Sequence, residues 1–323
     1  MAVYTQVSAE DLEHFLAGYD VGVLRSFKGI AEGVENSNFL VETDRARFIL
    51  TLYEKRVDTA DLPFFMALLD HLATRGCRVP PAIADRKGVQ IRELGGKAAC
   101  LIEFLDGFSV SHPSPAKATA TGAALGAMHN AAADFTLERP NSMGPDAWHD
   151  LAAKCAGSWD RIDPALERLV GEELAYLDTH WPNDLPRSVI HADLFPDNVL
   201  MIGDEVTGLI DFYFSCTDIR AYDLAVTHSA WCFSGDGKQF DKHVSVALLA
   251  GYRSQVALSE AEIAALPILA RGGALRFTLS RAYDWINTPA DAMVSRKDPA
   301  AFTRRLAFYR EHGSAAMFAA AST

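Results

Sequence analysis

The hydrophobic and polar positions in the first hundred residues predict a mixture of helix and strand. Ser8 followed by Asp11 resembles a capping box, and the apolar residues behind it share one face, so the pattern predicts a short helix over residues 8–18. Two runs rich in β-forming residues, 38–42 and 47–53, are separated by a four-residue turn and predict a hairpin.

A second helix and two further strands follow the hairpin. Leucine, phenylalanine and methionine recur at helical spacing from Leu62 onwards, and Gly76 is placed to end that helix. The runs IREL, near Gln90, and AACLIEF, residues 98–104, each predict a strand. The first part of the chain is therefore expected to be rich in β-structure.

Beyond residue 105 the pattern changes to long helical periods, beginning with residues 115–133. Short β-like runs interrupt the helices at 189–190, 199–202 and 209–210. The sequence thus predicts an α+β, bilobal fold with a small β-rich N-lobe, 1–105, and a larger mainly helical C-lobe, 106–323. Because small ligands usually bind in concave sites between lobes, we expect a ligand site at their junction.

The composition excludes several classes of function. The chain has 323 residues, of which 49% are hydrophobic, and a net charge of −12, so it can bury a core but carries no overall basic field for nucleic acid or an anionic membrane. Its five cysteines are scattered without a C-x-x-C pair, which favours free thiols in a reducing compartment. We find no signal peptide and no membrane-spanning segment, and we expect a cytoplasmic protein.

The stretch VIHADLFPDNVL carries the clearest chemistry. It places His191, Asp193 and Asn198 in the pattern H-x-D-x-x-x-x-N, the spacing of a kinase catalytic loop. Asp211 follows in GLIDFYF after a β-like run, where kinases carry the metal-binding aspartate of their D-F-G motif. Two such motifs in the right order favour phosphoryl transfer from ATP over the alternative that both aspartates cap local turns.

Each of these residue types suits a step of phosphoryl transfer. A hydroxyl is a weak nucleophile, so Asp193 is expected to orient it and accept its proton. Mg²⁺ prefers hard oxygen ligands, which the carboxylate of Asp211 and the amide of Asn198 supply. For His191 and Asp223 we favour structural roles, the first bracing the loop and the second either capping a helix or bracing the loop.

A run of small residues before the predicted hairpin offers a weaker signal for a phosphate-binding turn. It contains Gly29, Gly33, Asn36, Ser37 and Asn38. Small residues allow backbone N–H groups to approach phosphates, although glycines between strands are more often plain turns. Neither G-x-x-x-x-G-K-[ST] nor G-x-G-x-x-G is present, and H-E-x-x-H and G-x-S-x-G are absent too.

HADLFPDN followed by GLIDFY resembles the aminoglycoside phosphotransferase and choline kinase-like superfamily, which has a protein-kinase-like fold. With GIAEGVENSNFLVET, FILTLYEKRV, DLPFFMALLDHLATRG and LRFTLSRAYDW, the chain resembles the bacterial homoserine kinase family within it. The resemblance implies ATP-dependent phosphorylation of L-homoserine to O-phospho-L-homoserine, on the route to threonine. By motif matching, it places the base at Asp193, the Mg²⁺ ligands at Asn198 and Asp211, and the adenine-contacting hinge at Glu103 to Leu105.

One position departs from the kinase pattern. Thr51 stands in the strand FILTLYE where many kinases place the lysine of V-A-I-K, and the next helix has no obvious glutamate to pair with such a lysine. Lys55 lies four residues later and is one candidate for binding the phosphates. The alternative is that backbone groups near Asn36 to Asn38 and Mg²⁺ bind them. A solvated surface role for Lys55 is equally consistent with the sequence.

The amino-acid substrate needs partners for both of its charges. Arginine suits the carboxylate because its guanidinium donates two parallel hydrogen bonds. Arg276 is the first candidate because it stands between apolar neighbours, Arg281 is the second, and a buried structural arginine paired with an acid is the alternative. For the ammonium group the candidates are Asp197 and Asp218. A kinase of another hydroxyl compound, such as an aminoglycoside or choline, and a nucleotide-binding pseudokinase stay as alternatives, and the oligomeric state stays unknown.

Overall fold

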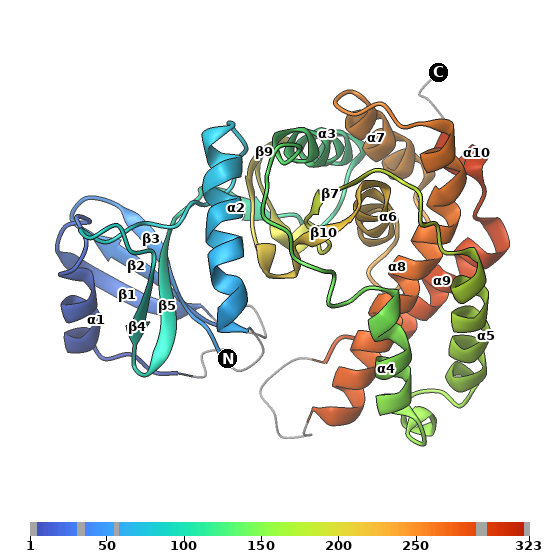
Figure 1. The fold of residues 1–323 in the computed structure, drawn as a ribbon, viewed down its shortest axis with the longest axis horizontal. Helices are drawn as coiled ribbons and strands as arrows, with labels where there is room; N and C mark the ends of the chain where they lie inside the picture. Colours follow the sequence, from blue (N-terminus) through green and yellow to red (C-terminus); the bar gives the residue numbers. More distant parts are fainter. Residues whose placement is uncertain (1–4, 31–35, 55–57, 289–295, 320–323) are drawn as a thin grey trace. The chain divides into compact units, whose positions relative to one another are not determined.

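The computed structural model describes residues 5–30, 36–54, 58–288 and 296–319. The contacts between residues divide the chain into two compact units, Met1–Asp106 and Gly107–Thr323 (Figure 1).

The N-terminal unit is built around one antiparallel sheet of five strands in the order β1-β2-β3-β5-β4. Its elements are α1 (Ala9–Leu16), β1 (Leu24–Ile30), β2 (Ser37–Thr43), β3 (Arg47–Leu52), the 3₁₀ turn η1 (Thr59–Asp61), α2 (Leu62–Thr74), β4 (Ile91–Leu94) and β5 (Lys97–Glu103). The predicted helices, the hairpin and the strands near residues 91 and 98 are all present.

The two faces of this sheet pack against different helices. Phe48, Leu50 and Leu52 of β3 join a buried core with Leu12 and Phe15 of α1. The alternate positions point to the other face, because successive side chains of a strand alternate. There Thr51 pairs with Cys100 of β5, whose thiol lies 3.6 Å from the sulfur of Met66 on α2. Thr51 and the α1 core thus occupy opposite faces.

β1 is the strand of this sheet that the sequence pattern did not predict. It is an edge strand with a register shift between Leu24 and Ser26, and none of its seven side chains is fully buried. A half-exposed edge strand needs no strict alternation of apolar and polar residues. The hydrophobic pattern therefore carries no signal for it.

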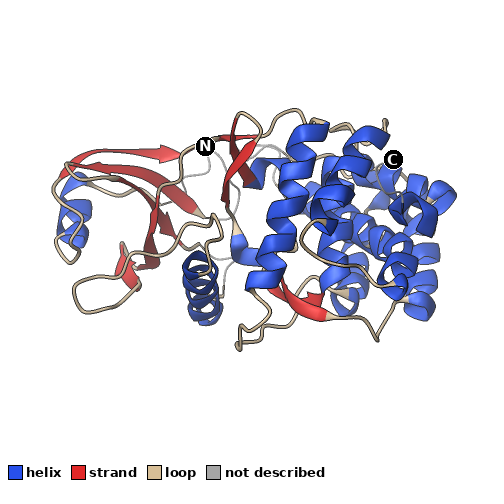
Figure 2. Ribbon diagram, turned by 90° about the horizontal axis from the view of Figure 1, so that it is seen from above, coloured by secondary structure: helices blue, strands red, loops and turns tan. Residues whose placement is uncertain are grey.

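The C-terminal unit is mainly helical and holds two small antiparallel sheets, β10-β7 and β6-β8-β9 (Figure 2). Its strands are β6 (Phe108–Ser109), β7 (Arg187–Ile190), β8 (Val199–Ile202), β9 (Glu205–Leu209) and β10 (Cys216–Ile219). Its α-helices are α3 (Pro115–Ala131), α4 (Pro145–Cys155), α5 (Ala165–His180), α6 (Arg220–Trp231), α7 (Lys242–Arg253), α8 (Glu260–Asn287), α9 (Ala300–His312) and α10 (Ala315–Ala319). Among the described residues, no helix is both long and apolar enough to cross a membrane.

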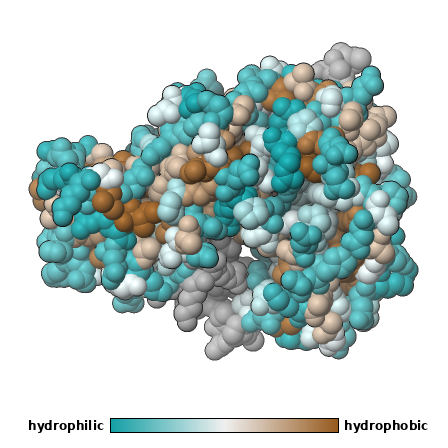
Figure 3. Space-filling model, viewed as in Figure 1, coloured by the Kyte–Doolittle hydropathy of each residue, from teal (hydrophilic) through white to brown (hydrophobic). Residues whose placement is uncertain are grey.

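The helices of this unit pack around α6 and α8. All residues of α6 from Ala221 to Trp231 are buried, and α8 packs against α4, α6 and α9. α3 and α7 approach closely at Gly122 and Gly251. Glycine permits this approach, because a side chain at either position would collide with backbone of the other helix. On the face seen in Figure 3, hydrophilic residues cover most of the surface and hydrophobic ones are scattered among them. An antiparallel sheet followed by a mainly helical region confirms the predicted fold class.

Candidate active site

The H-x-D-x-x-x-x-N segment forms a tight loop between β7 and β8. The loop starts directly after β7 and ends in the 3₁₀ turn Pro196–Asn198, immediately before β8. Within it, Ala192 adopts a φ of +64°, a left-handed conformation that is rare for residues with a Cβ atom. Such a loop needs specific contacts to hold its shape.

Asp223 of α6 provides one set of these contacts. Its buried carboxylate accepts hydrogen bonds from the backbone N–H groups of His191 at 2.7 Å and Ala192 at 2.8 Å, and from Nε2 of His129 at 3.0 Å. Burial alone would raise the pKa of Asp223, but the hydrogen bond and charge of His129, together with His191, bring that pKa below its usual value. The structure therefore confirms Asp223 as a brace of the loop.

His191 also braces the loop, as predicted. Its Nδ1 accepts the N–H of Asp193 at 3.2 Å, so its proton sits on Nε2, which donates to the carbonyl of Ile210 at 3.0 Å. Burial lowers the pKa of His191. A neutral ring with both nitrogens engaged holds the backbone in place and has no free position for proton transfer.

Asp193 lies half-buried at the centre of the loop. Burial raises the pKa of Asp193 to about 8, the Asp211 carboxylate adds to the rise, and the positive charges of Arg276 and Lys297 oppose it. The side-chain amide of Asn198 donates to the backbone carbonyl of Asp193 at 2.8 Å. In its ionised form, a carboxyl group with a raised pKa suits the acceptance of a proton from a hydroxyl.

The β8–β9 hairpin brings Asn198 close to the segment that carries Asp211. Val199 pairs with Leu209, and the N–H of Ile210 donates to the carbonyl of Asn198 at 3.0 Å. Asp211 is exposed and has a φ of +66°, the second such conformation at this site. The two residues thus meet at the open end of one hairpin.

These two side chains fit Mg²⁺ by the chemistry of their donor atoms. Asn198 uses its amide nitrogen toward Asp193, which leaves its amide oxygen as the acceptor, and Asp211 adds an exposed carboxylate. In the part of the chain that the structure describes, no group of three or more His, Cys, Asp or Glu gathers into a metal cluster. The fit is that of an ion which keeps water and nucleotide oxygens among its ligands.

Arg276 is buried against the loop. Its side chain is 1% exposed, and its Nη1 donates to the carbonyl oxygen of Ala192. The guanidinium lies over the rings of Phe277, at 4.6 Å, and Phe214, at 5.2 Å. From the sequence, the expected partner of this arginine is either the substrate carboxylate or a structural acid. The partner that the structure shows is a backbone carbonyl.

Arg281 and Lys297 are the more exposed cations beside the loop. Burial lowers the pKa of Arg281 to about 10, while the negative charges of Asp193 and Asp197 favour its protonated form. Nζ of Lys297 lies 3.6 Å from Oδ2 of Asp197 and 5.8 Å from the ring of Phe195. Lys297 could not be predicted from the sequence, because no motif marks it and its contact with the loop joins residues a hundred positions apart.

Asp218, the other candidate for the substrate ammonium, has protein partners of its own. It lies on β10, is 6% exposed, and accepts hydrogen bonds from Nδ2 of Asn141 and the N–H of Ile219, both at 2.7 Å. Arg187 lies 3.5 Å away. These contacts support the packing around β7 and β10, and a substrate role for Asp218 stays a prediction.

The predicted phosphate turn is described only in part, because Gly33 lies outside the described residues. Gly29 ends β1 opposite Phe39. Asn36 accepts the N–H of Glu54 at 3.3 Å, and Asn38 accepts the hydroxyl proton of Thr51 at 2.8 Å. The side chains of Asn36 and Asn38 therefore bond to other parts of this unit, and β2, which carries Asn38, is paired with strands on both sides.

The other nucleotide candidates lie on or after β3 and β5. Glu103 ends β5, where its N–H donates to the carbonyl of Pro81 at 3.1 Å, and Leu105 follows in the connection that leads out of the sheet. Lys55 lies outside the described residues. Its proposed contact with phosphates stays a prediction.

The N-terminal unit does contain a lysine–glutamate pair, Lys97 with Glu54, at 2.6 Å. Glu54 also accepts the hydroxyl protons of Thr5 at 2.7 Å and Ser37 at 2.8 Å. Strand alternation places Lys97 on the face of Ala99 and Leu101, the α1 core, and Thr51 on the opposite face. This pair therefore does not replace the lysine that is missing at Thr51.

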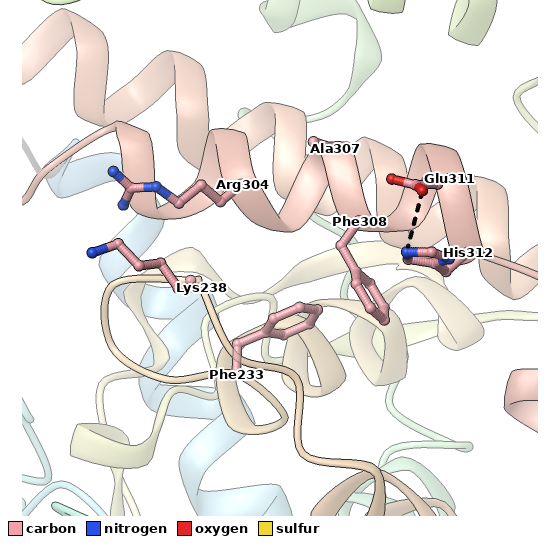
Figure 4. Close-up of a pocket in the computed structure, with 8 residues that line it drawn as sticks. Phe233, Lys238, Arg304, Ala307, Phe308, Glu311 and His312 are labelled. Carbon is pink, nitrogen blue, oxygen red and sulfur yellow. Dashed lines mark ion pairs between the residues drawn. The ribbon is translucent and has the colours of Figure 1, made fainter.

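A surface pocket of about 340 Å³ lies elsewhere in the C-terminal unit, between α9 and the loop that follows α6. Figure 4 shows the Phe233 and Phe308 rings on one side, Lys238 and Arg304 on another, and Glu311 paired with His312. None of the candidate site residues lines it. It is not the candidate active site.

Comparison with known proteins places the chain among phosphotransferases. A family model described as "Phosphotransferase enzyme family" matches residues 26–258. The homoserine kinase of Zymomonas mobilis is 54% identical over 313 residues, which is 96% of this chain and 98% of its relative. The homoserine kinase of Rhizobium rhizogenes is 51% identical over 318 residues, or 98% and 99% of the two chains.

Solved structures with much lower identity share the fold. An amicoumacin kinase matches with a TM-score of 0.69 at 15% identity over 95% of both chains. A spectinomycin phosphotransferase matches with a TM-score of 0.67 at 12% identity over 97% of this chain and 98% of its own. These similarities confirm the protein-kinase-like fold predicted from the sequence.

Proposed function

The chain belongs to the phosphotransferase enzyme family, and we propose that it is an ATP-dependent homoserine kinase. It transfers the γ-phosphoryl group of ATP to the side-chain hydroxyl of L-homoserine, giving ADP and O-phospho-L-homoserine on the route to threonine. The observation that carries this proposal is the identity of 51% and 54% to homoserine kinases along nearly the whole chain.

In this reaction Asp193 acts on the hydroxyl. It orients the oxygen and accepts its proton as the new oxygen–phosphorus bond forms and the bond from the γ-phosphorus to the ADP oxygen breaks. Its place in a loop braced by His191 and Asp223 supports the role, since a base must be held in one geometry.

Asn198 and Asp211 are the proposed ligands of Mg²⁺. Their oxygen atoms suit a hard cation, and the β8–β9 hairpin fixes their spacing. The ion, when bound, neutralises charge on the nucleotide phosphates. The protein itself contributes the ligand geometry.

The N-terminal unit is proposed to bind the nucleotide. Backbone groups of the β1–β2 connection and of the strand that follows meet the phosphates, and the end of β5 meets adenine. The residues assigned in this way are Gly29, Gly33, Asn36, Ser37, Asn38, Glu103 and Leu105, and Lys55, after β3 in the sequence, is a further candidate for the phosphates.

For the substrate, we assign the carboxylate to Arg281, with Lys297 beside it, and the ammonium group to Asp197. The electrostatic interactions of Arg281 and of Lys297 with Asp193 support this assignment, because charges interact in this way only when both cations lie near the proposed base. Arg276 and Asp218 are the second choices, since both are buried and bonded to protein groups.

A substrate panel tests the proposal. The purified protein is assayed with MgATP and, in turn, homoserine, choline, threonine, serine and kanamycin, with Asp193→Asn as the inactive control. Homoserine is expected to give the highest kcat/KM. A higher value for choline or kanamycin would assign the chain to another branch of the family, and ATP binding without transfer to any compound would indicate a pseudokinase. A cytoplasmic location is part of the proposal.

A further inference from the structure

The backbone is strained at Ala192, next to Asp193. Among the residues that the structure describes, Ala192 and Asp211 are the only ones other than glycine with positive φ. In this conformation the Cβ atom of an L-residue crowds the carbonyl oxygen that follows it. A residue stays in such a conformation only where its surroundings fix it.

The peptide unit that joins Ala192 to Asp193 is held at both polar ends. Its carbonyl oxygen accepts a hydrogen bond from Nη1 of Arg276, and its N–H donates to Nδ1 of His191 at 3.2 Å. The peptide unit before it is held by Asp223, which accepts the N–H of Ala192 at 2.8 Å. Because the two peptide planes are fixed, the direction in which the Asp193 side chain leaves the backbone is fixed too.

Arg276, like His191, which donates to the carbonyl of Ile210, also reaches the second motif. Its guanidinium lies 5.2 Å from the ring of Phe214, which belongs to the 3₁₀ turn η4 (Phe212–Phe214) that directly follows Asp211. One side chain of α8 thus contacts both the H-x-D loop and the segment after the proposed metal ligand.

Stability does not by itself account for an arginine at this position. The side chain is 1% exposed, and its Nε has no hydrogen-bond partner among the described residues. Burying a charge with an incomplete set of partners is costly, and well-packed apolar side chains often replace buried charges without loss. A role in the reaction is the better explanation.

We propose that Arg276 is a positioning residue for phosphoryl transfer: its hydrogen bond to the Ala192 carbonyl holds the strained loop so that Asp193 faces the substrate hydroxyl. This rests on the proposed function, in which Asp193 accepts the hydroxyl proton. It differs from the sequence-based assignment of Arg276 to the substrate carboxylate. The two roles can be told apart, because loss of a positioning residue lowers kcat whereas loss of a carboxylate ligand raises homoserine KM.

Arg305 of α9 is a matched control. It is 3% exposed, its Nη2 donates to the carbonyl of Ser234 at 3.1 Å, and its guanidinium lies 4.2 Å from the ring of Phe302. Its Nε also has no partner among the described residues. It is therefore a buried arginine of the same kind bonded to a different loop, and because Arg281 lies over the same Phe302 ring, the comparison uses kcat and not homoserine KM.

The experiment measures kcat, both KM values and Tm for Arg276→Lys, Arg276→Met, Arg305→Lys and Arg305→Met. Misplacement of a catalytic group by a small distance costs on the order of 10²-fold, so kcat of Arg276→Met is expected to fall by about that factor. Arg276→Lys keeps a donor and a charge and should recover part of the loss. The KM values for homoserine and ATP should change little, because substrate binding is not the step affected. The Arg305 variants should lose comparable Tm and keep their kcat.

Two results would overturn the inference. A strong rise in homoserine KM with kcat retained would make Arg276 a substrate ligand. An equal fall of kcat in the Arg305 variants would make the effect one of general stability. Should Arg276→Met not fold, Phe214→Leu removes the ring under the guanidinium, and unchanged kcat in both Phe214→Leu and Arg276→Lys would reject the proposal. If the unchanged protein phosphorylates another compound of the panel, the same constants are measured on that compound, and if it phosphorylates none, both proposals fail.

Discussion

Two charged clusters, one in each unit, show how differently a buried carboxylate can be used. Glu54 in the N-terminal unit accepts hydrogen bonds from Lys97, Thr5 and Ser37. Burial by itself raises the pKa of Glu54, but these hydrogen bonds bring it below its usual value. Asp193 in the C-terminal unit has the opposite balance, since burial raises its pKa to about 8.

The two pKa shifts differ because the protein supplies hydrogen-bond donors to the Glu54 carboxylate more completely than to the Asp193 carboxylate. Glu54 has a full set of donors and follows an ordinary strand, so its charge stabilises the fold. Asp193 lies beside strained backbone, and the hydrogen bonds around it hold the loop backbone. A carboxylate that the fold leaves incompletely partnered is the one available to a substrate.

The strongest test of the chemical cluster is Asp211→Ala. We expect activity to be abolished and Mg²⁺-dependent ATP binding to weaken, because the site loses its exposed carboxylate ligand and the described residues contain no metal cluster to replace it. Titration of ATP with and without Mg²⁺ measures the binding. An unchanged MgATP affinity would contradict the assignment.

Asp193→Asn is expected to lower kcat by roughly 10²–10⁴-fold, the usual contribution of a positioned base. Nucleotide affinity and Tm should stay close to those of the unchanged protein, because Asp193 meets the reacting hydroxyl and asparagine keeps its shape. Steady-state kinetics and thermal unfolding give both values. Turnover near the original level would remove the distinction between Asp193 and an ordinary structural acid.

Arg281→Met tests whether the cations beside the loop face the substrate. A hydrogen bond to a charged group contributes about 1.5–3 kcal/mol, so homoserine KM should rise roughly 10- to 100-fold with ATP KM nearly constant. 3-Aminopropanol, which lacks the carboxylate, should be a poor substrate for the unchanged protein. Arg304→Met is the control, because Nη1 of Arg304 instead donates to the backbone carbonyl of Asp236. Equal use of 3-aminopropanol and homoserine would exclude a carboxylate site.

Most of the fold could be predicted from the sequence because the helices and central strands carry strong periodicity. The two motifs with Asp193, Asn198 and Asp211 could be recognised too, since spacing within one loop and one hairpin is local. Phosphotransferase membership, predicted from the same motifs, is confirmed by the family match and the homoserine kinase relatives.

What escaped prediction depends on tertiary contacts. β1 is an edge strand without alternation, and Lys297 reaches the loop from a distant segment. The bond from Arg276 to Ala192 joins positions 84 residues apart. The apolar neighbours of Arg276 did predict a buried guanidinium, but sequence spacing contains no information on which carbonyl it meets.

Glu54→Gln gives the smallest expected effect and tests the structural cluster. The folded-state pKa of Glu54 is below its unfolded value, so its charge stabilises the protein above the unfolded pKa, about 4.3, and this contribution is lost as pH falls through the folded pKa. Glu54→Gln should lower stability at pH 7 by about 1–2 kcal/mol. The difference in Tm from the unchanged protein should hold from pH 7 to about pH 5 and shrink as the pH falls below about 4.3 toward the folded pKa, while exposed Glu205→Gln has no effect at either end of this range. A constant difference across this range would show that the Glu54 cluster does not stabilise the protein through its charge.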